Sequence, residues 1–135
     1  MGTESRWRDP GTPGTLPSVI SEMQGQRVLT YAGDEPTLGS ERAATDLIGD
    51  AFGAEAGVVV VPADRVAPDF YTLSTRVAGE VVRKFQMYHI RLVVLGDITA
   101  HVEASEAFRA FVHEINRGSD IWFVRDEREL SAKLA

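Results

Sequence analysis

Two short apolar runs constrain the fold of this chain more than any other feature of its sequence. Residues 58–61 are four consecutive valines, and residues 90–95 are apolar except for Arg91. Continuous runs of β-branched residues are typical of strands that are covered on both faces, as they are in parallel sheets. We expect two further strands, at residues 27–31 and 121–124.

Apolar residues spaced three or four apart predict helices between these strands. The first has a buried stripe that includes Phe52 and is expected to end at Gly57. Gly49 and Gly53 lie on this helix, where glycine is unfavourable, so we expect them to permit close packing on a sheet. The predicted helices span residues 40–56, 75–88 and 105–118, with a short terminal helix after residue 126.

The alternation of strands and helices determines the predicted architecture. Parallel strands joined by helices of this length require right-handed crossovers. We therefore predict an α/β fold, a small single domain with a parallel or mixed sheet of about four to five strands and helices packed on it. Sites in such sheets usually lie in the loops at the carboxyl ends of the strands, here residues 62–74, 96–104 and 125–126.

The first 25 residues differ in composition from the rest. They hold three of the six prolines and four of the twelve glycines, without a period of 2 or 3.6. A segment of this kind cannot bury enough apolar area to offset its chain entropy. We predict a disordered tail over residues 1–25 and a single α/β domain over residues 26–135.

The composition excludes several classes of function. The absence of cysteine excludes disulfides, thiolate metal sites and a thiol nucleophile. The three histidines are twelve residues apart, which is not a metal-ligand spacing, and no glycine-rich nucleotide loop is present, so we predict no metal and no cofactor. A net charge of −6 argues against nucleic acid as a partner. No apolar run could span a membrane and no signal peptide is recognisable, so we expect a cytoplasmic protein.

The strongest local signal is the polar stretch at residues 62–88. We interpret it as a partner or ligand surface at the start of a helix, where free N–H groups favour an anion. The alternative is a solvated loop followed by the exposed face of an amphipathic helix. Ser74 and Thr75 would then only cap that helix, whereas on a recognition surface a kinase could reach them. The surface residues that we expect are Asp69, Tyr71, Ser74, Thr75, Arg76, Arg83, Lys84 and Tyr88, joined by Asn116 and Arg117 at the sheet edge.

Three acidic residues are candidates for proton transfer. Asp97 follows an apolar strand at its carboxyl end, where it could serve a reaction or cap the next turn. Glu80 follows Gly79 in a predicted helix, so either another backbone packs against the glycine or Glu80 lies in a partly buried polar cluster. Glu114 neighbours His113, and both are expected on the solvent side of their helix.

A series of short motifs in residues 26–135 matches one family pattern in order and spacing. They are Asp69-Phe70-Tyr71-x-Leu73, Ala78-Gly79-Glu80, Lys84-Phe85, Tyr88, Arg91-Leu92, Gly96-Asp97, Phe111-Val112-x-Glu114, Asn116-Arg117-Gly118 and Phe123-Val124. Through these motifs the sequence resembles a bacterial family known as domain of unknown function 4180. The family usually has Gly in place of Arg76, Gln in place of Arg83, Asn in place of Met87 and often Ser in place of Ile115, so a family site at these positions would be altered here.

The order of elements is similar to that of the STAS (anti-sigma-factor-antagonist) fold, in which a small α/β domain binds a kinase or another protein. In that fold a Ser or Thr at the start of a central helix is a phosphorylation switch, and Ser74 and Thr75 lie in the corresponding region. The Asp-Ser-Ser-Gly style loop of those antagonists is absent from this chain.

Two functions remain open on the sequence. The first is a non-catalytic STAS-like interaction module in bacterial regulation, which binds a protein partner or forms a homodimer. The second is a small-molecule-binding protein or an enzyme of a biosynthetic pathway, with the acidic candidates around a pocket for a small anionic ligand. A dimer would form through an exposed aromatic residue such as Trp122 or Phe70.

Overall fold

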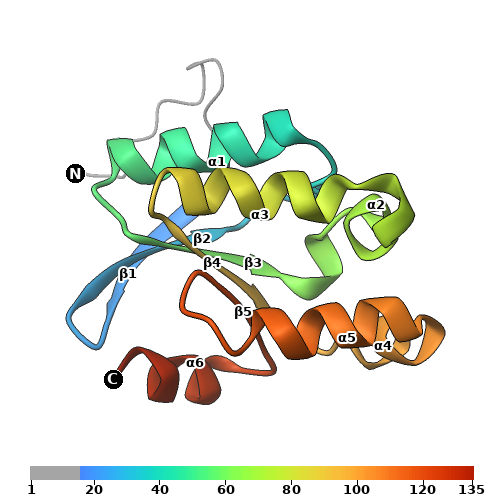
Figure 1. The fold of residues 1–135 in the computed structure, drawn as a ribbon. Helices are drawn as coiled ribbons and strands as arrows, with labels where there is room; N and C mark the ends of the chain where they lie inside the picture. The colour runs from blue at the N-terminus through green and yellow to red at the C-terminus, as the bar shows by residue number, and fades with distance from the viewer. Residues whose placement is uncertain (1–15) are drawn as a thin grey trace.

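The computed structural model describes residues 16–135, which form a single α/β domain around a five-stranded sheet (Figure 1). The strand order is β1-β2-β3-β4-β5. Strand β1 (Ser18–Met23) pairs antiparallel with β2 (Gln26–Tyr31), and the remaining strands run parallel to β2. They are β3 (Val58–Pro62), β4 (Arg91–Leu95) and β5 (Ile121–Val124). The predicted mixed α/β sheet is confirmed.

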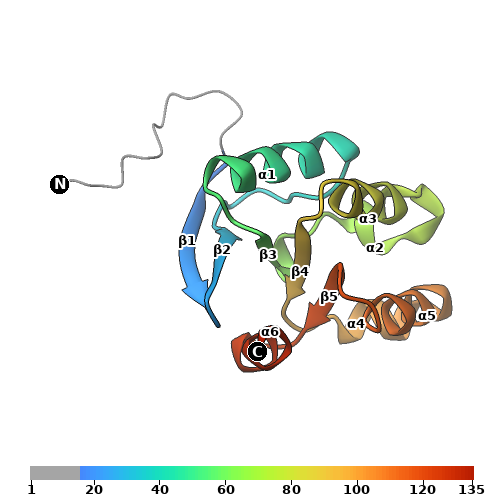
Figure 2. The same ribbon diagram turned by 60° about the vertical axis from the view of Figure 1, so that its left-hand side comes forward.

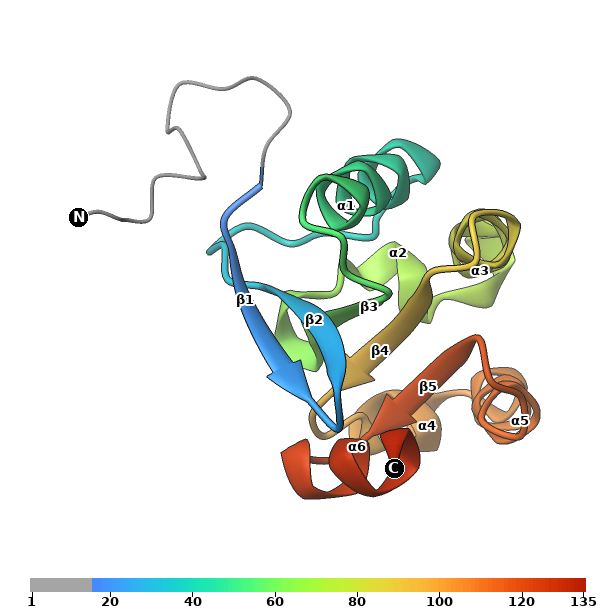
Figure 3. The ribbon, with the colours of Figure 1, turned by 90° about the vertical axis from the view of Figure 1, so that its left-hand side faces the viewer.

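The helices that connect the parallel strands lie on one face of the sheet. They are α1 (Glu41–Gly53), α3 (Val77–Met87) and α5 (Glu106–Ile115). Consecutive parallel strands are neighbours, so crossovers of one hand place these helices on the same face, and α6 (Glu127–Leu134) lies on the other (Figures 2 and 3). None of the helices in residues 16–135 is long and apolar enough to cross a membrane.

Short elements complete the connections between strands and long helices. Two of them, the 3₁₀ turn η1 (Ala63–Arg65) and helix α2 (Pro68–Tyr71), follow β3. A second 3₁₀ turn, η2 (Leu73–Thr75), precedes α3. Helix α4 (Thr99–Ala104) lies within residues 96–104, which the sequence predicts as a loop.

The sheet separates two apolar cores. Val59, Val61 and Phe123 face the layer of α1, α3 and α5, whereas Val58 and Val60 face α6. Because both faces are covered, the valine run does not alternate with polar residues. Trp122 belongs to the smaller core and Phe70 to the larger one, and both are buried. The expected dimer contact through an exposed Trp122 or Phe70 is therefore wrong.

Strand β1 lies within residues that the sequence predicts as disordered. Gln24 and Gly25 both have positive φ, 53° and 75°, as a two-residue turn of type I′ between twisted strands requires. Ile20 packs against the larger core and Met23 against the smaller one. The disorder prediction is wrong for residues 18–23 because the hairpin stabilises a strand that has little apolar alternation. The rest of the tail before residue 16 lies outside the described residues.

Three helix glycines have no internal packing role. A Cβ built at Gly49, Gly53 or Gly79 would meet no other atom within 4 Å, and all three residues are exposed. The expectation that Gly49 and Gly53 permit close packing is wrong, and of the two alternatives for Gly79 the one in which another backbone packs against it is wrong as well. Each glycine costs roughly 1 kcal/mol relative to Ala. Helix α1 also ends before Gly57, because Glu55 takes the left-handed conformation (φ 58°) beyond its last turn.

Candidate functional site

The turn that leads into α3 holds the predicted hydroxyl residues. We call Thr72–Arg76 the α3 entry turn. The Thr75 hydroxyl can donate to Asp69 O (2.7 Å) or to Thr72 O (2.8 Å), and it accepts a hydrogen bond from Val77 N (3.2 Å). Thr75 therefore ties both ends of the turn together while remaining exposed, and the neighbouring Ser74 is exposed as well.

Arg76 occupies a backbone conformation that favours glycine. It is the N-cap residue of α3 and has φ 69° and ψ 2°, in the left-handed region. A side chain there costs roughly 1–2 kcal/mol, because Cβ approaches the following carbonyl oxygen. The resemblance described above implies Gly at position 76, and the left-handed backbone conformation gives a physical reason for it. In this chain the position presents an exposed guanidinium at the start of α3.

The other charged residues expected on the surface differ in how far they are exposed. Asp69 and Arg83 are exposed, and Arg117 forms an exposed ion pair with Glu114 (3.7 Å). Lys84 is half-buried and pairs with Glu41 of α1 (3.6 Å). A second carboxylate near Lys84 in the sequence, Glu80, forms no ion pair within residues 16–135.

Tyr71 lies inside the fold and does not contribute to an exposed surface. Its hydroxyl donates to Ala63 O (2.7 Å), and its ring stacks on His101 with centroids 3.6 Å apart. Burial, followed by the charge of Asp64, raises the pKa of Tyr71 well above its usual range. Tyr71 therefore stays protonated and holds α2 against η1. Its partner His101 on α4 was missed as a contact because no sequence pattern links the two positions.

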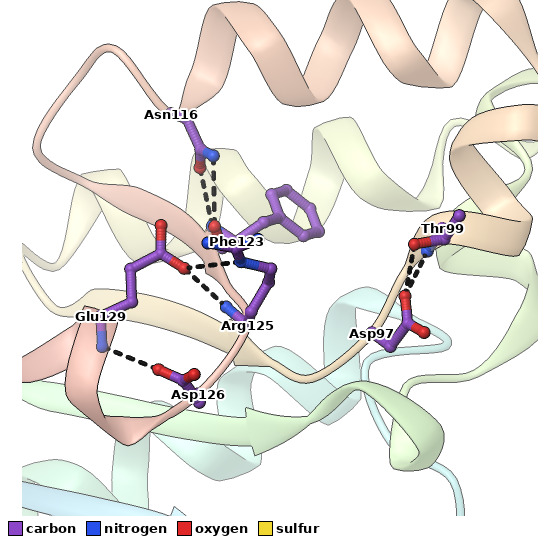
Figure 4. A network of polar contacts seen from close by, with 7 residues as sticks. All are labelled: Asp97, Thr99, Asn116, Phe123, Arg125, Asp126 and Glu129. Atoms are coloured by element: carbon purple, nitrogen blue, oxygen red, sulfur yellow. Dashed lines mark hydrogen bonds and ion pairs between the residues drawn. The ribbon is translucent and has the colours of Figure 1, made fainter.

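The three acidic candidates lie on different elements. Glu80 is half-buried on α3, and Glu114 is exposed on α5. Asp97 is exposed after β4, where its carboxylate accepts hydrogen bonds from the amide and hydroxyl of Thr99 (Figure 4). These hydrogen bonds lower the pKa of Asp97, whereas a general base works best with a pKa near the working pH. The structure does not assemble the three acids into one acid–base site.

A cleft of about 370 Å³ opens at the carboxyl ends of β4 and β5. Asp97 and Asn116 line it, together with Arg125 and Glu129. The Asn116 side chain donates to Phe123 O (3.2 Å) and accepts from Phe123 N (2.7 Å), so it takes the place of a neighbouring strand at the edge of β5 (Figure 4). The Glu129 carboxylate accepts a hydrogen bond from Arg125 N (2.8 Å), the main-chain amide that follows that of Phe123 on the open side of this edge.

A second cleft, of about 490 Å³, lies beside the stacked rings of Tyr71 and His101. Its walls come from α2, the α3 entry turn and the junction of α4 with α5, and they include Ser74. Neither this cleft nor the one at Asp97 is lined by Glu80, Glu114 or Arg76. Within residues 16–135 no group of three or more histidine or acidic side chains is placed to hold a metal ion.

One exposed apolar cluster contradicts the sequence prediction. Phe52 belongs to the predicted buried stripe of the first helix, yet it is 54% exposed. Its ring meets that of Tyr88 edge-on with centroids 6.0 Å apart, and Met87 is 56% exposed. Apolar periodicity marks residues that avoid water, and it does not tell whether the covering partner belongs to the same chain. The one sequence feature that points to this cluster is Met87, because the resemblance implies Asn at that position.

Comparison with known proteins identifies one family. The family described as "Domain of unknown function (DUF4180)" matches residues 23–134, which cover α1 to α6 and every parallel strand. No curated protein and no solved structure was found to match the chain. Because the family match covers most of the sequence, the chain belongs to the DUF4180 family of domains of unknown function.

Proposed function

We propose that this chain is a non-catalytic STAS-like module that binds a protein partner and acts in regulation in the bacterial cytoplasm. The binding surface consists of the α3 entry turn and the exposed side of α3. The observation that carries the proposal is the position of Thr75, an exposed hydroxyl that joins Asp69, Thr72 and Val77 immediately before an eleven-residue helix.

Phosphorylation of Thr75 would alter this turn in two ways. The phosphate has no hydroxyl hydrogen to donate to Asp69 O or Thr72 O, so one of the contacts that closes the turn is lost. It also brings negative charge beside the Arg76 guanidinium and the first N–H groups of α3, which favour an anion. Both effects change the surface that a partner meets, and they give the module two states.

The placement of the acidic residues supports binding over catalysis. Glu80, Asp97 and Glu114 come from three elements and share neither described cleft. Asp97 is held by Thr99 in its charged form, which makes it a weak base. The exposed polar residues of the proposed surface, in contrast, lie within one turn and one helix.

Three full-length variants test the proposal. Thr75→Glu adds negative charge, Thr75→Val removes the hydroxyl at the same size, and Ser74→Glu adds the same charge one residue earlier. Proteins retained by each immobilised variant are identified and quantified by mass spectrometry. We expect Thr75→Glu to change the amount of a specific partner at least about tenfold, with a smaller effect of Thr75→Val and Ser74→Glu. Equal retention by all variants, or no specific partner for any of them, contradicts the proposal.

The cleft at Asp97 favours a second candidate, a small-molecule-binding function. Its volume of about 370 Å³ falls within the usual range for ligand pockets. Arg125 is the cation of this cleft and pairs with Glu129 (3.7 Å), so a small anionic ligand would take the place of Glu129 beside it. A thermal-shift screen with small carboxylates and phosphates tests this alternative. A compound whose stabilising effect is lost in Arg125→Gln but kept in Arg128→Gln supports it, and the absence of any such compound rejects it.

A further inference from the structure

The sheet has one covered edge and one open edge. At the covered edge, Asn116 and Glu129 bind main-chain groups of β5 and of the residue that follows it. At the other edge β1 is the outermost strand of the sheet (Figure 3). Natural edge strands usually avoid further pairing through a lysine, a proline or a bulge. Strand β1 contains neither lysine nor proline, and it pairs residue for residue with β2 without a bulge.

The hairpin determines which main-chain groups of β1 point away from β2. In an antiparallel pair, alternate residues exchange both of their hydrogen bonds with the neighbouring strand. Met23 flanks the two-residue turn, and Ala32 N donates to Pro17 O (2.9 Å), so the odd-numbered residues of β1 bind β2. The N–H and C=O groups of Ile20 and Glu22 therefore point outward. These groups have no hydrogen-bond partner within residues 16–135.

An uncovered apolar side chain lies on the same strand. Val19 is 56% exposed and belongs to neither core. It shares one face of the sheet with Ser21 and Met23, because side chains alternate along a strand. Met23 packs partly against the smaller core on this face. The edge therefore offers main-chain groups and an apolar side chain to a further strand.

We propose that two copies of this chain pair antiparallel through β1, about a two-fold axis at Ser21, so that their five-stranded sheets become continuous. Ile20 then lies opposite Glu22 of the second copy, and each such pair exchanges both of its main-chain hydrogen bonds. Val19 lies opposite Met23 of the second copy, so each exposed valine is covered by an apolar side chain.

The groups that already have partners select this register. An axis at Val19 would bring Glu22 opposite Leu16, whose N–H already donates to a carboxylate of α1 (2.9 Å). An axis at Ile20 would bring Val19 opposite Ser21 and leave the valine without an apolar neighbour. The axis at Ser21 uses the outward groups of both Ile20 and Glu22. It also keeps the two Glu22 carboxylates from lying directly opposite each other.

The strand itself selects a second copy as the occupant. A two-fold interface requires a surface that is complementary to itself, and Val19 and Met23 lie two residues to either side of Ser21. Because the edge of β5 is covered, the pairing stops at two copies. The strand is short, so we expect a dimer that forms at high concentration and dissociates on dilution. This inference goes beyond the proposed function, since β1 belongs neither to α3 nor to its entry turn.

Single cysteines test the position of the axis, because the chain has no cysteine of its own. Residues opposite each other in a non-hydrogen-bonded antiparallel pair have Cα atoms about 4.5 Å apart, within the range of a disulfide. Full-length Ser21→Cys, Val19→Cys and Met87→Cys are each oxidised with diamide, and covalent dimers are quantified by non-reducing electrophoresis. We expect Ser21→Cys to crosslink at least about tenfold faster than the other two, whose sulfur atoms would be too far apart.

Variants that block the edge should weaken the dimer. Glu22→Pro removes an outward N–H and keeps the hydrogen bonds between β1 and β2, whereas Val19→Lys places a charge where the second strand would lie. Sedimentation equilibrium of the full-length chain measures the dissociation constant, and circular dichroism shows whether each variant is folded. We expect both changes to raise the dissociation constant at least about tenfold, while Met87→Lys at the exposed cluster leaves it unchanged.

Three results would overturn the inference. The first is a chain that stays monomeric at the highest concentration that remains in solution. The second is faster crosslinking of Val19→Cys or Met87→Cys than of Ser21→Cys, which would move the contact to another register or to another surface. The third is an unchanged dissociation constant in folded Val19→Lys, and it counts even if Glu22→Pro unfolds the hairpin.

Discussion

At the scale of single residues, backbone conformation accounts for features that composition does not explain. Arg76 has φ 69°, so a position whose backbone favours Gly carries a strained arginine. Such strain persists when the surrounding structure holds the residue in place, and it is concentrated at functional sites. Arg76 therefore lowers the stability of the fold, and it places an exposed guanidinium at the start of α3.

Replacing Arg76 by glycine should therefore stabilise the fold. We expect Arg76→Gly to raise the free energy of unfolding by about 0.5–1 kcal/mol, because the relief of strain exceeds the added entropy of the unfolded chain. Urea denaturation measures the change. The matched control is Arg83→Gly inside α3, which should lower the free energy of unfolding by about 1 kcal/mol. Destabilisation by both changes to the same extent would contradict the assigned conformation of Arg76.

Alanine at the exposed glycines should also stabilise the free protein. Gly49→Ala and Gly79→Ala are each expected to add about 1 kcal/mol, because the new Cβ atoms meet open space and Ala is the better helix former. Thermal unfolding followed by circular dichroism measures the effect, with Gly96→Ala as the control. Gly96 has φ 142° and would place Cβ 2.9 Å from that of Ala63, so this change should destabilise. A loss of stability at Gly49 or Gly79 would reveal packing that the structure lacks.

Tyr71 gives the fold a dependence on alkaline pH. Its folded-state pKa is raised by burial, so the stability it contributes is present below its unfolded pKa of 10.0 and is lost as pH rises above that value. Tyr71→Phe should cost about 1 kcal/mol at neutral pH through the lost bond to Ala63 O. It should also flatten the fall in unfolding free energy as pH rises above about 10. Tyr31, whose pKa is likewise raised, retains part of that slope. An unchanged slope in Tyr71→Phe would contradict the burial of the hydroxyl.

At the scale of elements, side chains cover the open edge of β5. The edge of β5 is covered by the Asn116 side chain, which binds both main-chain groups of Phe123, and by Glu129, which accepts from Arg125 N. Open edge strands pair with other chains, and covering groups of this kind prevent it. Asn116 is therefore better explained as a structural residue than as a ligand contact.

Removing this cover should expose the edge of β5. We expect Asn116→Ala to lower the free energy of unfolding by about 1–3 kcal/mol, since two partly buried main-chain groups lose their partners. It should also produce association that grows with concentration, measured by static light scattering. Arg117→Ala, which removes only an exposed ion pair, serves as the control. A monomeric Asn116→Ala of unchanged stability would contradict the assigned role.

The sequence predicts elements well where one physical signal dominates. The valine run and residues 90–95 predict β3 and β4, and apolar spacing predicts α1 and α5, whose N-cap residues in the structure are Ser40 and Ser105. Strand β1 was missed because a two-residue hairpin turn, and not apolar alternation, stabilises it. Helix α4 was missed because its short sequence relies on the Tyr71–His101 stack for its position.

At the scale of the whole molecule, α1, α3 and α5 form a single layer on one face of the sheet. The sides of α1 and α3 that face away from the sheet are therefore exposed to solvent. The sequence predicts parallel crossovers, but it does not predict that the strands lie in the sheet in the order in which they occur in the chain. This strand order places the connecting helices on one face. It brings Phe52 beside Tyr88 and Glu41 beside Lys84, although the members of each pair are far apart in the chain. The candidate surface is consequently larger than residues 62–88 indicate.

The most direct test of the central claim, that the chain binds a protein through α3 and its entry turn, is backbone amide shift mapping by NMR. Uniformly labelled full-length protein is titrated with the partner captured by the unmodified chain, in parallel with Thr75→Glu. We predict shift changes concentrated in residues 72–87, extending to α1, and largely lost in Thr75→Glu. Shift changes confined to the cleft lined by Asp97 and Arg125, or an equal response of Thr75→Glu, would contradict the claim.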